Sequence, residues 1–573
     1  MKFSELSKYL EKLEKTSSRI EITKILASVF KEADPNEIDK IVYLVLGRLA
    51  PSYKNIVFNI AERMMLRVIS QAYDKDIKEV KELYKQKGDL GDVAESLDKG
   101  KGKGLSVSNV YERALAIAQD EGEKSQERKV KEMARLLSDI DPLSARFVAR
   151  IPVGKLRLGF SDKTILDALS WMKNGDKSAK TKLEKAFQTT PDVGALAKKV
   201  KKLGIDKASK DTSPVLGVPI LPMLAQRLKS PVEMIKKMRK VAVEPKLDGL
   251  RISIHFKRGV KNKGFVKAFT RNLNETSWMF PELKDISKYI RAKEVILDSE
   301  AIGLDEETKA LVNFQTTMTR RRKHAIEEAA SKVPIKFYVF DVLYKNGKNL
   351  MGKTYLERRK VLEKTVREGK LFQIVDYSLT DSPEEISRLN AKKRKEGLEG
   401  IMVKKADSAY VPGRTGWRWV KMKEAEKALG KLADTVDCLV MGYSMGRGRR
   451  AQFGVGQFLV GVRDKEEIKT VTKIGTGLTD EQFRELKKRL SKLEVKDKPK
   501  EYVVHRNLEP DSWVKSSLVV EIAADEITKS PTHSSSLALR FPRLVRFRDD
   551  KSVNQATTLS EVKKLFELQK AGP

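Results

Sequence analysis

At residues 244–251 the chain reads Glu-Pro-Lys-Leu-Asp-Gly-Leu-Arg, directly after the apolar run at 241–243. The apolar run predicts a buried strand, and the glycine predicts a turn after it. A lysine becomes a nucleophile when burial or a neighbouring cation lowers its pKa, and an arginine can orient a phosphorus atom for attack. The stretch therefore indicates a site at a strand end, with Lys246 as the candidate nucleophile and Arg251 as a phosphate anchor. The alternative is an ordinary surface turn between two strands.

Six further short motifs follow in the chain. They are the segments 269–272 (Phe-Thr-Arg-Asn), 296–300 (Ile-Leu-Asp-Ser-Glu), 337–341 (Phe-Tyr-Val-Phe-Asp), 399–404 (Glu-Gly-Ile-Met-Val-Lys), 419–423 (Trp-Val-Lys-Met-Lys), and 540–543 (Arg-Phe-Pro-Arg) with 548–551 (Arg-Asp-Asp-Lys). Together with 244–251 they resemble, in family order, the motifs of the covalent nucleotidyltransferases, which are DNA ligases, RNA ligases and mRNA capping enzymes. Each motif alone is weak evidence, but seven motifs in the family's order are not expected by chance.

The composition agrees with a nucleic-acid enzyme. The 573 residues include 115 basic and 79 acidic side chains, and the net charge of +36 points to a polyanionic partner. No apolar run approaches the ~18 residues of a spanning helix, and no signal peptide opens the chain, so we expect no membrane association. One cysteine and four histidines exclude a disulfide framework and argue against a zinc site. Cys438 lies in an apolar run and is expected to be a core thiol in a protein of the reducing cytoplasm.

Periodicity divides the chain into three regions, since 573 residues are too many for one core. Residues 1–212 have apolar positions at helical spacing and predict an all-α domain. Residues 213–424 begin with a proline-rich linker and then alternate short strands with helices, which predicts an α+β domain. Residues 425–573 consist mainly of strand candidates that suit a small five-stranded barrel, followed by a terminal helix at 559–568. This order resembles the three-domain DNA ligases of archaea and eukaryotes: a helical DNA-binding domain, a nucleotidyltransferase (adenylation) domain and an OB-fold domain.

The segment 150–159 resembles the G-K-L-R-x-G element in the helical DNA-binding domain of those ligases. Its glycines would let backbone amides approach phosphates, and Lys155 and Arg157 would supply charge. The alternative is a connector between two helices with solvated cations.

The resemblance implies a three-step reaction. Lys246 would attack the α-phosphorus of ATP and hold AMP, the AMP would pass to the 5′-phosphate of a nick, and the 3′-hydroxyl would then seal the strand. Asp248 would orient Lys246 or its loop, Glu244 would accept from the adenine amine, and Phe340 would stack on the adenine. The expected phosphate contacts are Arg251, Arg271, Arg414, Lys421, Lys423, Arg548 and Lys551.

The expected cofactors are ATP and Mg²⁺. Glu300 and Glu399 are the magnesium candidates, because Mg²⁺ takes hard oxygen ligands, usually one or two carboxylates with phosphates and waters. The sequence leaves open whether Glu300 binds the ribose instead. Whether ADP or NAD also serves is likewise open.

Two other classes of protein have to be weighed against a ligase. The segment 347–354 (Gly-Lys-Asn-Leu-Met-Gly-Lys-Thr) satisfies the P-loop pattern and suggests a DNA-dependent ATPase or helicase. We expect instead a two-residue hairpin turn at Asn346-Gly347, a returning strand at 350–351, and Thr354 as the N-cap of the next helix. A catalytically inactive DNA-clamping protein is the second alternative, and the presence of the acidic and basic motif residues argues against it.

The expected partner is nicked duplex DNA, since a capping enzyme or RNA ligase would not need the long helical region. We expect a monomer. In the segment 412–416 (Pro-Gly-Arg-Thr-Gly), related enzymes often carry two arginines, whereas here the second position is Thr415, so Arg414 or Arg418 would have to make the phosphate contact. Related archaeal ligases can carry a sliding-clamp peptide in the helical domain. At that place only the Lys-Gly run ending at residues 105–107 is found, so a clamp partner has no support.

Overall fold

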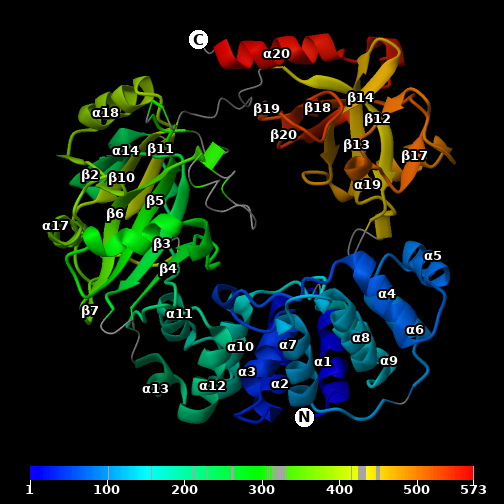
Figure 1. Cartoon of the computed structure of the whole chain (residues 1–573), viewed down its shortest axis with the longest axis horizontal. Coiled ribbons are helices and arrows are strands. Elements are labelled where there is room, and N and C mark those ends of the chain that lie inside the picture. The colour runs from blue at the N-terminus through cyan, green and yellow to red at the C-terminus, as the bar shows by residue number, and fades with distance from the viewer. Residues whose placement is uncertain are drawn as a thin grey trace. The chain divides into compact units, whose positions relative to one another are not determined.

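The computed structural model covers residues 1–573 and describes the chain except at residues 101, 157, 211–212, 229, 260–263, 306, 309, 313–315, 318–319, 321–329, 331, 414–415, 424–433, 447–451 and 572–573. The contacts divide the chain into two compact units, Met1–Asp74 with Ala94–Glu424, and Lys75–Val93 with Ala425–Pro573. Figure 1 labels the helices and strands. No helix in the described ranges is long and apolar enough to cross a membrane.

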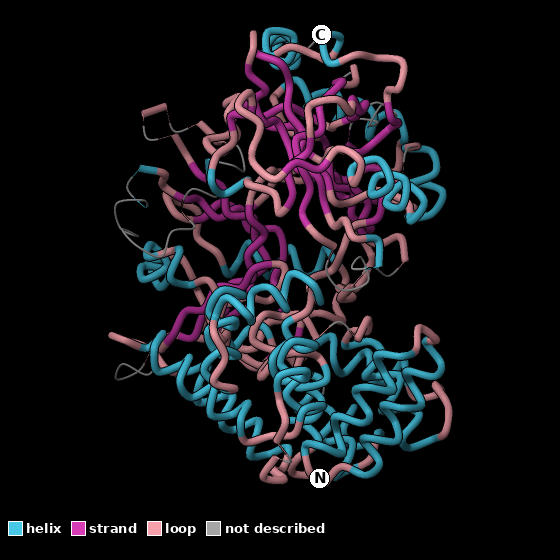
Figure 2. Tube along the Cα trace, turned by 90° about the vertical axis from the view of Figure 1, so that its right-hand side faces the viewer, coloured by secondary structure: helices cyan, strands magenta, loops and turns pink. Residues whose placement is uncertain are grey.

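The N-terminal part of the chain is helical, as the apolar spacing predicts (Figure 2). Its helices are α1 (Phe3–Lys15), α2 (Arg19–Glu32), α3 (Ile38–Val45), α4 (Glu62–Ala72), α5 (Ile77–Lys87), α6 (Leu90–Leu97), α7 (Val107–Gln119), α8 (Ser125–Ser138), α9 (Pro142–Arg150), α10 (Asp162–Asn174), α11 (Lys180–Thr189), α12 (Val193–Leu203) and α13 (Ile205–Lys210). Several begin at capping side chains: Ser106 accepts from the backbone of Asn109, and Asp192 from that of Ala195. The apolar positions at helical spacing continue from Ile38 to Leu49, but α3 ends at Val45, and the chain turns at Gly47 with a φ of +69°.

A five-stranded sheet carries the segment that contains Lys246. Its order is β1 (Gln226–Arg227), β11 (Trp419–Lys423), β10 (Gly400–Lys405), β2 (Val241–Pro245) and β9 (Ser378–Thr380). On one face, apolar side chains of β2, β10 and β11 pack against α14 (Pro231–Met238) and α18 (Pro383–Lys395). Because side chains alternate along a strand, the opposite face carries a different set: Glu244, Met402, Lys404, Trp419 and Lys421.

A second sheet has the order β4 (Phe265–Thr270), β3 (Leu250–Lys257), β5 (Glu294–Gly303), β6 (Ile335–Lys345) and β7 (Lys348–Asn349), with β8 (Phe372–Ile374) also beside β6. Ile252, Leu297 and Val339 bury one face in an apolar core that also includes residues of α17 (Tyr355–Thr365). On the other face Arg251 lies opposite Glu300, and Glu300 opposite Tyr338.

The two sheets meet through the faces that carry the polar side chains. An apolar cluster joins Ile296 and Leu343 of the second sheet to Trp419 of the first, with Tyr410 packed between them. The guanidinium of Arg251 lies 5.3 Å from the centre of the Trp419 ring, and the ammonium of Lys404 lies 4.5 Å from that of Phe340. The candidate residues of both sheets are therefore brought to one place.

The segment with the P-loop pattern is a hairpin followed by a helix, and it does not wrap a phosphate. Lys345 pairs with Lys348, and Asn346 and Gly347 form the two-residue turn with φ of +47° and +83°. Thr354 is the N-cap of α17 and forms a capping box with Glu357. The predicted turn and cap are confirmed. The returning strand was predicted at 350–351 and lies instead at Lys348–Asn349, because a two-residue turn starts the return at once.

The C-terminal part is built mainly of strands. The described residues form a sheet of β12 (Val436–Ser444), β13 (Gln457–Asp464), β14 (Glu467–Ile474), β15 (Glu494–Val495), β16 (Tyr502–Val503), β17 (Ser512–Val514), β18 (Val519–Ala523) and β21 (Arg543–Phe547), and a pair of β19 (Glu526–Lys529) and β20 (Leu537–Arg540). The helices are α19 (Asp480–Leu490) and the terminal α20 (Leu559–Ala571). Cys438 is fully buried in this core, and burial raises the pKa of its thiol, as expected of a core residue.

Candidate active site between the two sheets

Lys246 lies just beyond the end of β2, where the pairing with β10 holds it against Glu399. Its backbone N–H donates to the carbonyl of Gly400 at 2.9 Å. Its ammonium nitrogen lies 2.5 Å from a carboxylate oxygen of Glu399, and the two side chains are 19% and 30% exposed. The candidate nucleophile and a candidate metal ligand, 153 residues apart in the sequence, are thus an ion pair that opens to solvent.

Two glycines of the motifs are required by close packing. A Cβ on Gly249 would lie 2.6 Å from the carbonyl oxygen of Ala301 on β5. A Cβ on Gly400 would lie 2.3 Å from the carbonyl oxygen of Met422 on β11, and Gly400 has a φ of +135°. Only glycine fits both positions, because backbone atoms cannot yield as a flexible side chain can.

Arg251 is fixed by partners within the protein. Its Nε and Nη2 donate to the two carboxylate oxygens of Asp298 at 3.0 and 2.7 Å, and its Nη1 donates to the carbonyl of Met223 at 2.7 Å. The hydroxyl of Tyr410 donates to Asp298 at 2.9 Å and accepts from the backbone N–H of Met223 at 3.0 Å. Burial lowers the pKa of Arg251, but the attraction of Asp298 outweighs it, so the net shift is upward. This network holds a permanent cation at the site.

Glu300 lies on β5, directly opposite Arg251 on β3 of the same sheet, and has a raised pKa. Burial raises its pKa to about 7, although Arg251 and Lys246 oppose the shift, and the negative charges of Asp298 and Asp248 add to it. Asp248 itself is exposed on the loop after Lys246. Burial therefore destabilises the charged form of the Glu300 carboxylate.

Glu244 is enclosed at the inner end of the same face. One carboxylate oxygen lies 2.6 Å from the ammonium of Lys404, and the other accepts a short hydrogen bond from the hydroxyl of Tyr355. Phe340 projects from β6 toward the same place and contacts Trp419 edge-on, with ring centres 5.9 Å apart. The predicted Glu244 and Phe340 are thus brought together by way of Lys404.

The structure describes some of the remaining predicted site residues and leaves others outside the described ranges. Arg271 is exposed just after β4 and lines a small pocket with Arg251, Asp298 and Tyr410. Lys421 lies opposite Met402 on the face of β11 that meets the second sheet. Arg157 and Arg414, and the side chain of Lys423, lie outside the described residues.

Comparison with known families now bears on the whole chain. Residues 222–423 match the model of the ATP dependent DNA ligase domain, residues 2–170 the DNA ligase N terminus, and residues 451–551 the ATP dependent DNA ligase C terminal region. A probable DNA ligase of Dictyoglomus turgidum is 40% identical over 581 residues, which are 100% of this chain and 98% of that protein.

The chain belongs to the ATP-dependent DNA ligase family.

Other members of this ligase family agree over the same length. The DNA ligase of Pyrobaculum islandicum is 37% identical over 594 residues, covering 100% of this chain and 99% of that one. A solved structure titled Pmar-Lig_PreS3 aligns over 95% of this chain and 99% of its own with a TM-score of 0.53; at 19% identity it supports the fold alone. The protein is thus an ATP-dependent DNA ligase with an N-terminal helical domain, a nucleotidyltransferase domain and a C-terminal domain. The helicase and inactive-clamp alternatives find no support.

The carboxylates of this ligase suit a divalent cation. Glu399 and Glu300 offer hard oxygen atoms of the kind that a divalent cation binds, and burial disfavours the charged form of Glu300, a cost that a bound cation would offset. The described residues contain no group of three or more metal-ligating side chains.

The predicted residues of the flanking domains are placed as follows. Lys155 lies in the connector between α9 and α10 and forms an ion pair with Glu62. Arg548 and Lys551 follow β21, and both pair with Asp437 on β12, at 3.1 and 2.6 Å. One buried carboxylate therefore holds both cations of the closing motif.

Several residues of the site were not assigned a role from the sequence. Asp298 and Lys404 lie within the quoted motifs, and their inward-facing strand positions were a usable signal. Tyr410 and Tyr355 carry no such signal, because only the packing of the chain brings their hydroxyls to Asp298 and Glu244.

Proposed function

We propose that this ligase seals nicks in duplex DNA with Lys246 as the residue that carries AMP. The observation that supports this most is the solvent-open pair of Lys246 and Glu399 at the junction of the two sheets, with Glu244 two residues earlier on the same face. Alternation along β2 directs positions 244 and 246 to one side, so a nucleotide could contact both ends of this row.

Lys246 loses its ammonium proton to solvent, to which its side chain is open, and its nitrogen then attacks the α-phosphorus of ATP. A nitrogen–phosphorus bond forms as the bond to pyrophosphate breaks. An oxygen of the 5′-phosphate at the nick next attacks the same phosphorus and releases Lys246. Finally the 3′-hydroxyl attacks the activated 5′-phosphorus, closes the strand and expels AMP. Because charge at phosphorus dominates each step, fixed cations such as Arg251 are the main contribution of the protein.

The other side chains bind and orient. Glu244 accepts from the adenine amine, Phe340 stacks on the base, and Asp248 orients the loop of Lys246. Glu300 and Glu399 would hold Mg²⁺, which when bound offsets the negative charge that develops on phosphate oxygens. The cations proposed to contact phosphates are Arg251, Arg271, Arg414, Lys421, Lys423, Arg548 and Lys551.

We propose the domain limits 1–212, 213–424 and 425–573, with an OB-fold in the last. The meander β12–β13–β14 and the partner strands of β12 support the OB-fold. Lys155 and Arg157 of the helical domain contact DNA phosphates, which the charge of +36 supports.

The test is Lys246→Ala in the full chain, incubated with α-labelled ATP, denatured, and examined for label on the protein. We expect no attached AMP and no sealing, while binding of nicked DNA stays within about three-fold, because affinity comes from many phosphate contacts. Lys257→Ala is the control. Lys257, on β3, pairs with Glu294, on β5, outside the site, so this variant should attach AMP as wild type does. Robust labelling of Lys246→Ala would show that another residue is the nucleophile.

A further inference from the structure

We propose that Tyr355 and Lys404 set the base specificity of the nucleotide site by holding the Glu244 carboxylate as a hydrogen-bond acceptor. This inference rests on the proposed role of Glu244 toward the adenine amine. It assigns to Tyr355 and Lys404 a positioning role, in which they act on the nucleotide through Glu244.

The three side chains come from three elements and are nearly closed to solvent. Tyr355, the first residue of α17, donates its hydroxyl hydrogen to Oε1 of Glu244 on β2. Lys404 on β10 lies 2.6 Å from Oε2, and the side chains of Lys404 and Glu244 are 2% and 3% exposed. One carboxylate oxygen therefore accepts a hydrogen bond from Tyr355, and the other forms an ion pair with Lys404.

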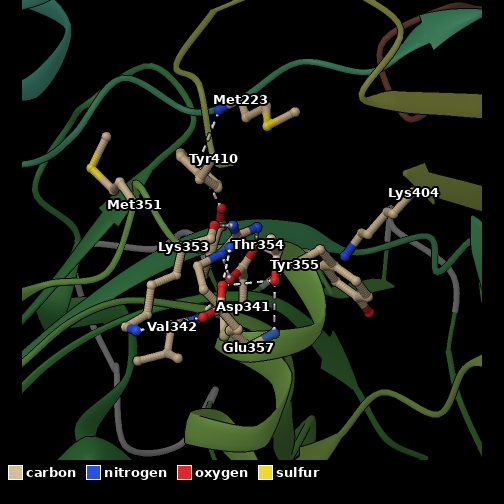
Figure 3. Close-up of polar contacts among 12 residues, drawn as sticks. Met223, Asp341, Val342, Met351, Lys353, Thr354, Tyr355, Glu357, Lys404 and Tyr410 are labelled. Atoms are coloured by element: carbon tan, nitrogen blue, oxygen red, sulfur yellow. Dashed lines mark hydrogen bonds and ion pairs between the residues drawn. The ribbon is translucent and has the colours of Figure 1, made fainter. Parts of the chain in front are cut away.

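Aromatic rings surround the ammonium of Lys404. It lies 4.4 Å from the centre of Trp419, 4.5 Å from Phe340 and 5.2 Å from Tyr355, and Figure 3 shows it pointing toward the Tyr355 ring. Such rings favour a cation by their electron-rich faces. Lys404 is thereby held as the cation paired with Glu244, and the ring proposed to stack on the base is part of the same cluster.

The position of Tyr355 is fixed by contacts that Arg358, in the same helix α17, makes with the surrounding chain. Arg358, which is fully buried, donates from Nε and Nη2 to the two oxygens of Asp341 at 2.7 and 2.9 Å. Its Nη1 donates to the carbonyl of Lys353 at 2.6 Å, which fixes the start of the helix. The hydroxyl of Tyr355 consequently has little freedom to turn away from Glu244.

The chemical consequence is selection at position 6 of a purine. A carboxylate kept ionised by a neighbouring ammonium can only accept hydrogen bonds, so it pairs with the 6-amino group of adenine. A 6-oxo purine would set its carbonyl oxygen against that carboxylate, and a buried polar group without a partner is rejected strongly. Without the Tyr355 hydroxyl, the carboxylate is free to rotate and this discrimination weakens.

The experiment measures self-adenylation by ATP and the corresponding transfer from inosine triphosphate, in the full-length Tyr355→Phe variant. We expect KM for ATP to rise by about ten-fold, as for loss of one hydrogen bond to a charged group, with kcat nearly unchanged. The preference for ATP over inosine triphosphate should fall by a similar factor. Tyr9→Phe, which also loses a tyrosine-to-glutamate hydrogen bond but in the helical domain, should behave as wild type.

Two further variants separate the ways in which the inference can fail. Lys404→Met should lower the same preference, and Lys404→Arg should restore it, so a folding defect in one variant does not leave the question undecided. An unchanged KM and base preference in folded Tyr355→Phe overturns the inference. If Glu244→Gln also leaves the base preference unchanged, Glu244 does not read the base and the proposed function of that residue fails as well.

Discussion

At the scale of single residues, the acids around Lys246 differ in their surroundings more than in their chemistry. Glu399 faces a lysine and keeps a solvent-open position, whereas Glu300 lies on a buried strand between two further acids and one arginine. Because identical carboxyl groups acquire different affinities for protons and cations from such neighbours, the structure separates two glutamates that the sequence treats alike.

The raised pKa of Glu300 predicts a pH-dependent cost in stability. The folded pKa of about 7 lies above the ordinary value of 4.5, so the folded state binds the proton more tightly, and the stability gained at low pH is lost as the pH rises toward 7. Without magnesium, Glu300→Gln should therefore melt at least about 2 °C above wild type at pH 8. Below pH 4.5 the two proteins should have the same melting temperature.

The check is a melting series from pH 4 to pH 8 with and without magnesium. Added Mg²⁺ should stabilise wild type at pH 8 more than Glu300→Gln, because the variant lacks the ionisable ligand. Glu466→Gln, an exposed position on a turn, is the control. A gap of the same size at every pH would show that Glu300 is not titrating as its surroundings indicate.

At the scale of elements, the site depends on how β10 is held between its neighbours. Strand pairing places Glu244, Met402 and Lys421 side by side across β2, β10 and β11. Gly400 begins β10, accepts the hydrogen bond from the backbone of Lys246, and touches Met422. A shift of β10 therefore also shifts Lys246, because the two are joined by this backbone hydrogen bond.

Gly400→Ala is expected to destabilise the protein by about 2–3 kcal/mol or more, because both its φ and the 2.3 Å approach to a backbone oxygen exclude a Cβ. Self-adenylation per folded molecule should fall with it, since the Lys246 loop shifts. Gly347→Ala is the matched control: its φ is +83°, but its Cβ would meet nothing within 4 Å, so a loss of about 1 kcal/mol without loss of labelling is expected. Equal effects of the two substitutions in denaturant melts would refute the packing argument.

At the scale of the whole molecule, the residues proposed for the reaction belong to separate units of the chain. The Lys246 site lies in the unit that ends at Glu424, whereas Arg548 and Lys551 belong to the C-terminal unit, where Asp437 holds both of them. We expect this closing motif to serve only the first step, self-adenylation. A domain closure that delivers it is of a common kind in multi-domain enzymes.

Arg548→Ala or Lys551→Ala should therefore lose most self-adenylation, about ten-fold or more, yet seal a nick whose 5′ end already carries AMP. The two half-reactions are measured on one preparation. Arg546→Ala, which removes a neighbouring pair with Glu521, is the control for damage to the sheet. If both half-reactions and the melting temperature fall together, the two cations serve only to stabilise the domain through Asp437.

Binding to nicked duplex should weaken steeply with salt, with a slope near −0.9 for each phosphate neutralised. Lys155→Gln should reduce that slope by about one contact and weaken binding on every sequence alike. Lys393→Gln is the control, because Lys393 lies on α18, behind the five-stranded sheet, and pairs with Glu396. A slope unchanged by Lys155→Gln would indicate that its pair with Glu62 is structural.

Much of this ligase follows from local patterns in its sequence. Apolar spacing predicts the helical N-terminal region. The strand candidates at 438–443, 457–463, 468–474 and 518–523 start within two residues of β12, β13, β14 and β18. The turn at Asn346-Gly347 and the cap at Thr354 follow from residue chemistry alone. The motif order predicts the family and the ATP-dependent DNA ligase activity, because those residues follow one another in a fixed order along the chain.

Only the tertiary structure decided which of these residues meet. The pairing of Lys246 with Glu399, the bidentate hold of Asp298 on Arg251, and the approach of Tyr355 to Glu244 each join positions between 47 and 153 residues apart. Side-chain contacts of this kind depend on strand register and on the packing of two sheets, which no local pattern encodes. The sequence by itself determined what chemistry the chain carries, and the packing of the two sheets determined which side chains hold Glu244, Arg251 and Glu300 in place, because burial and charge act only between groups that the fold brings into contact.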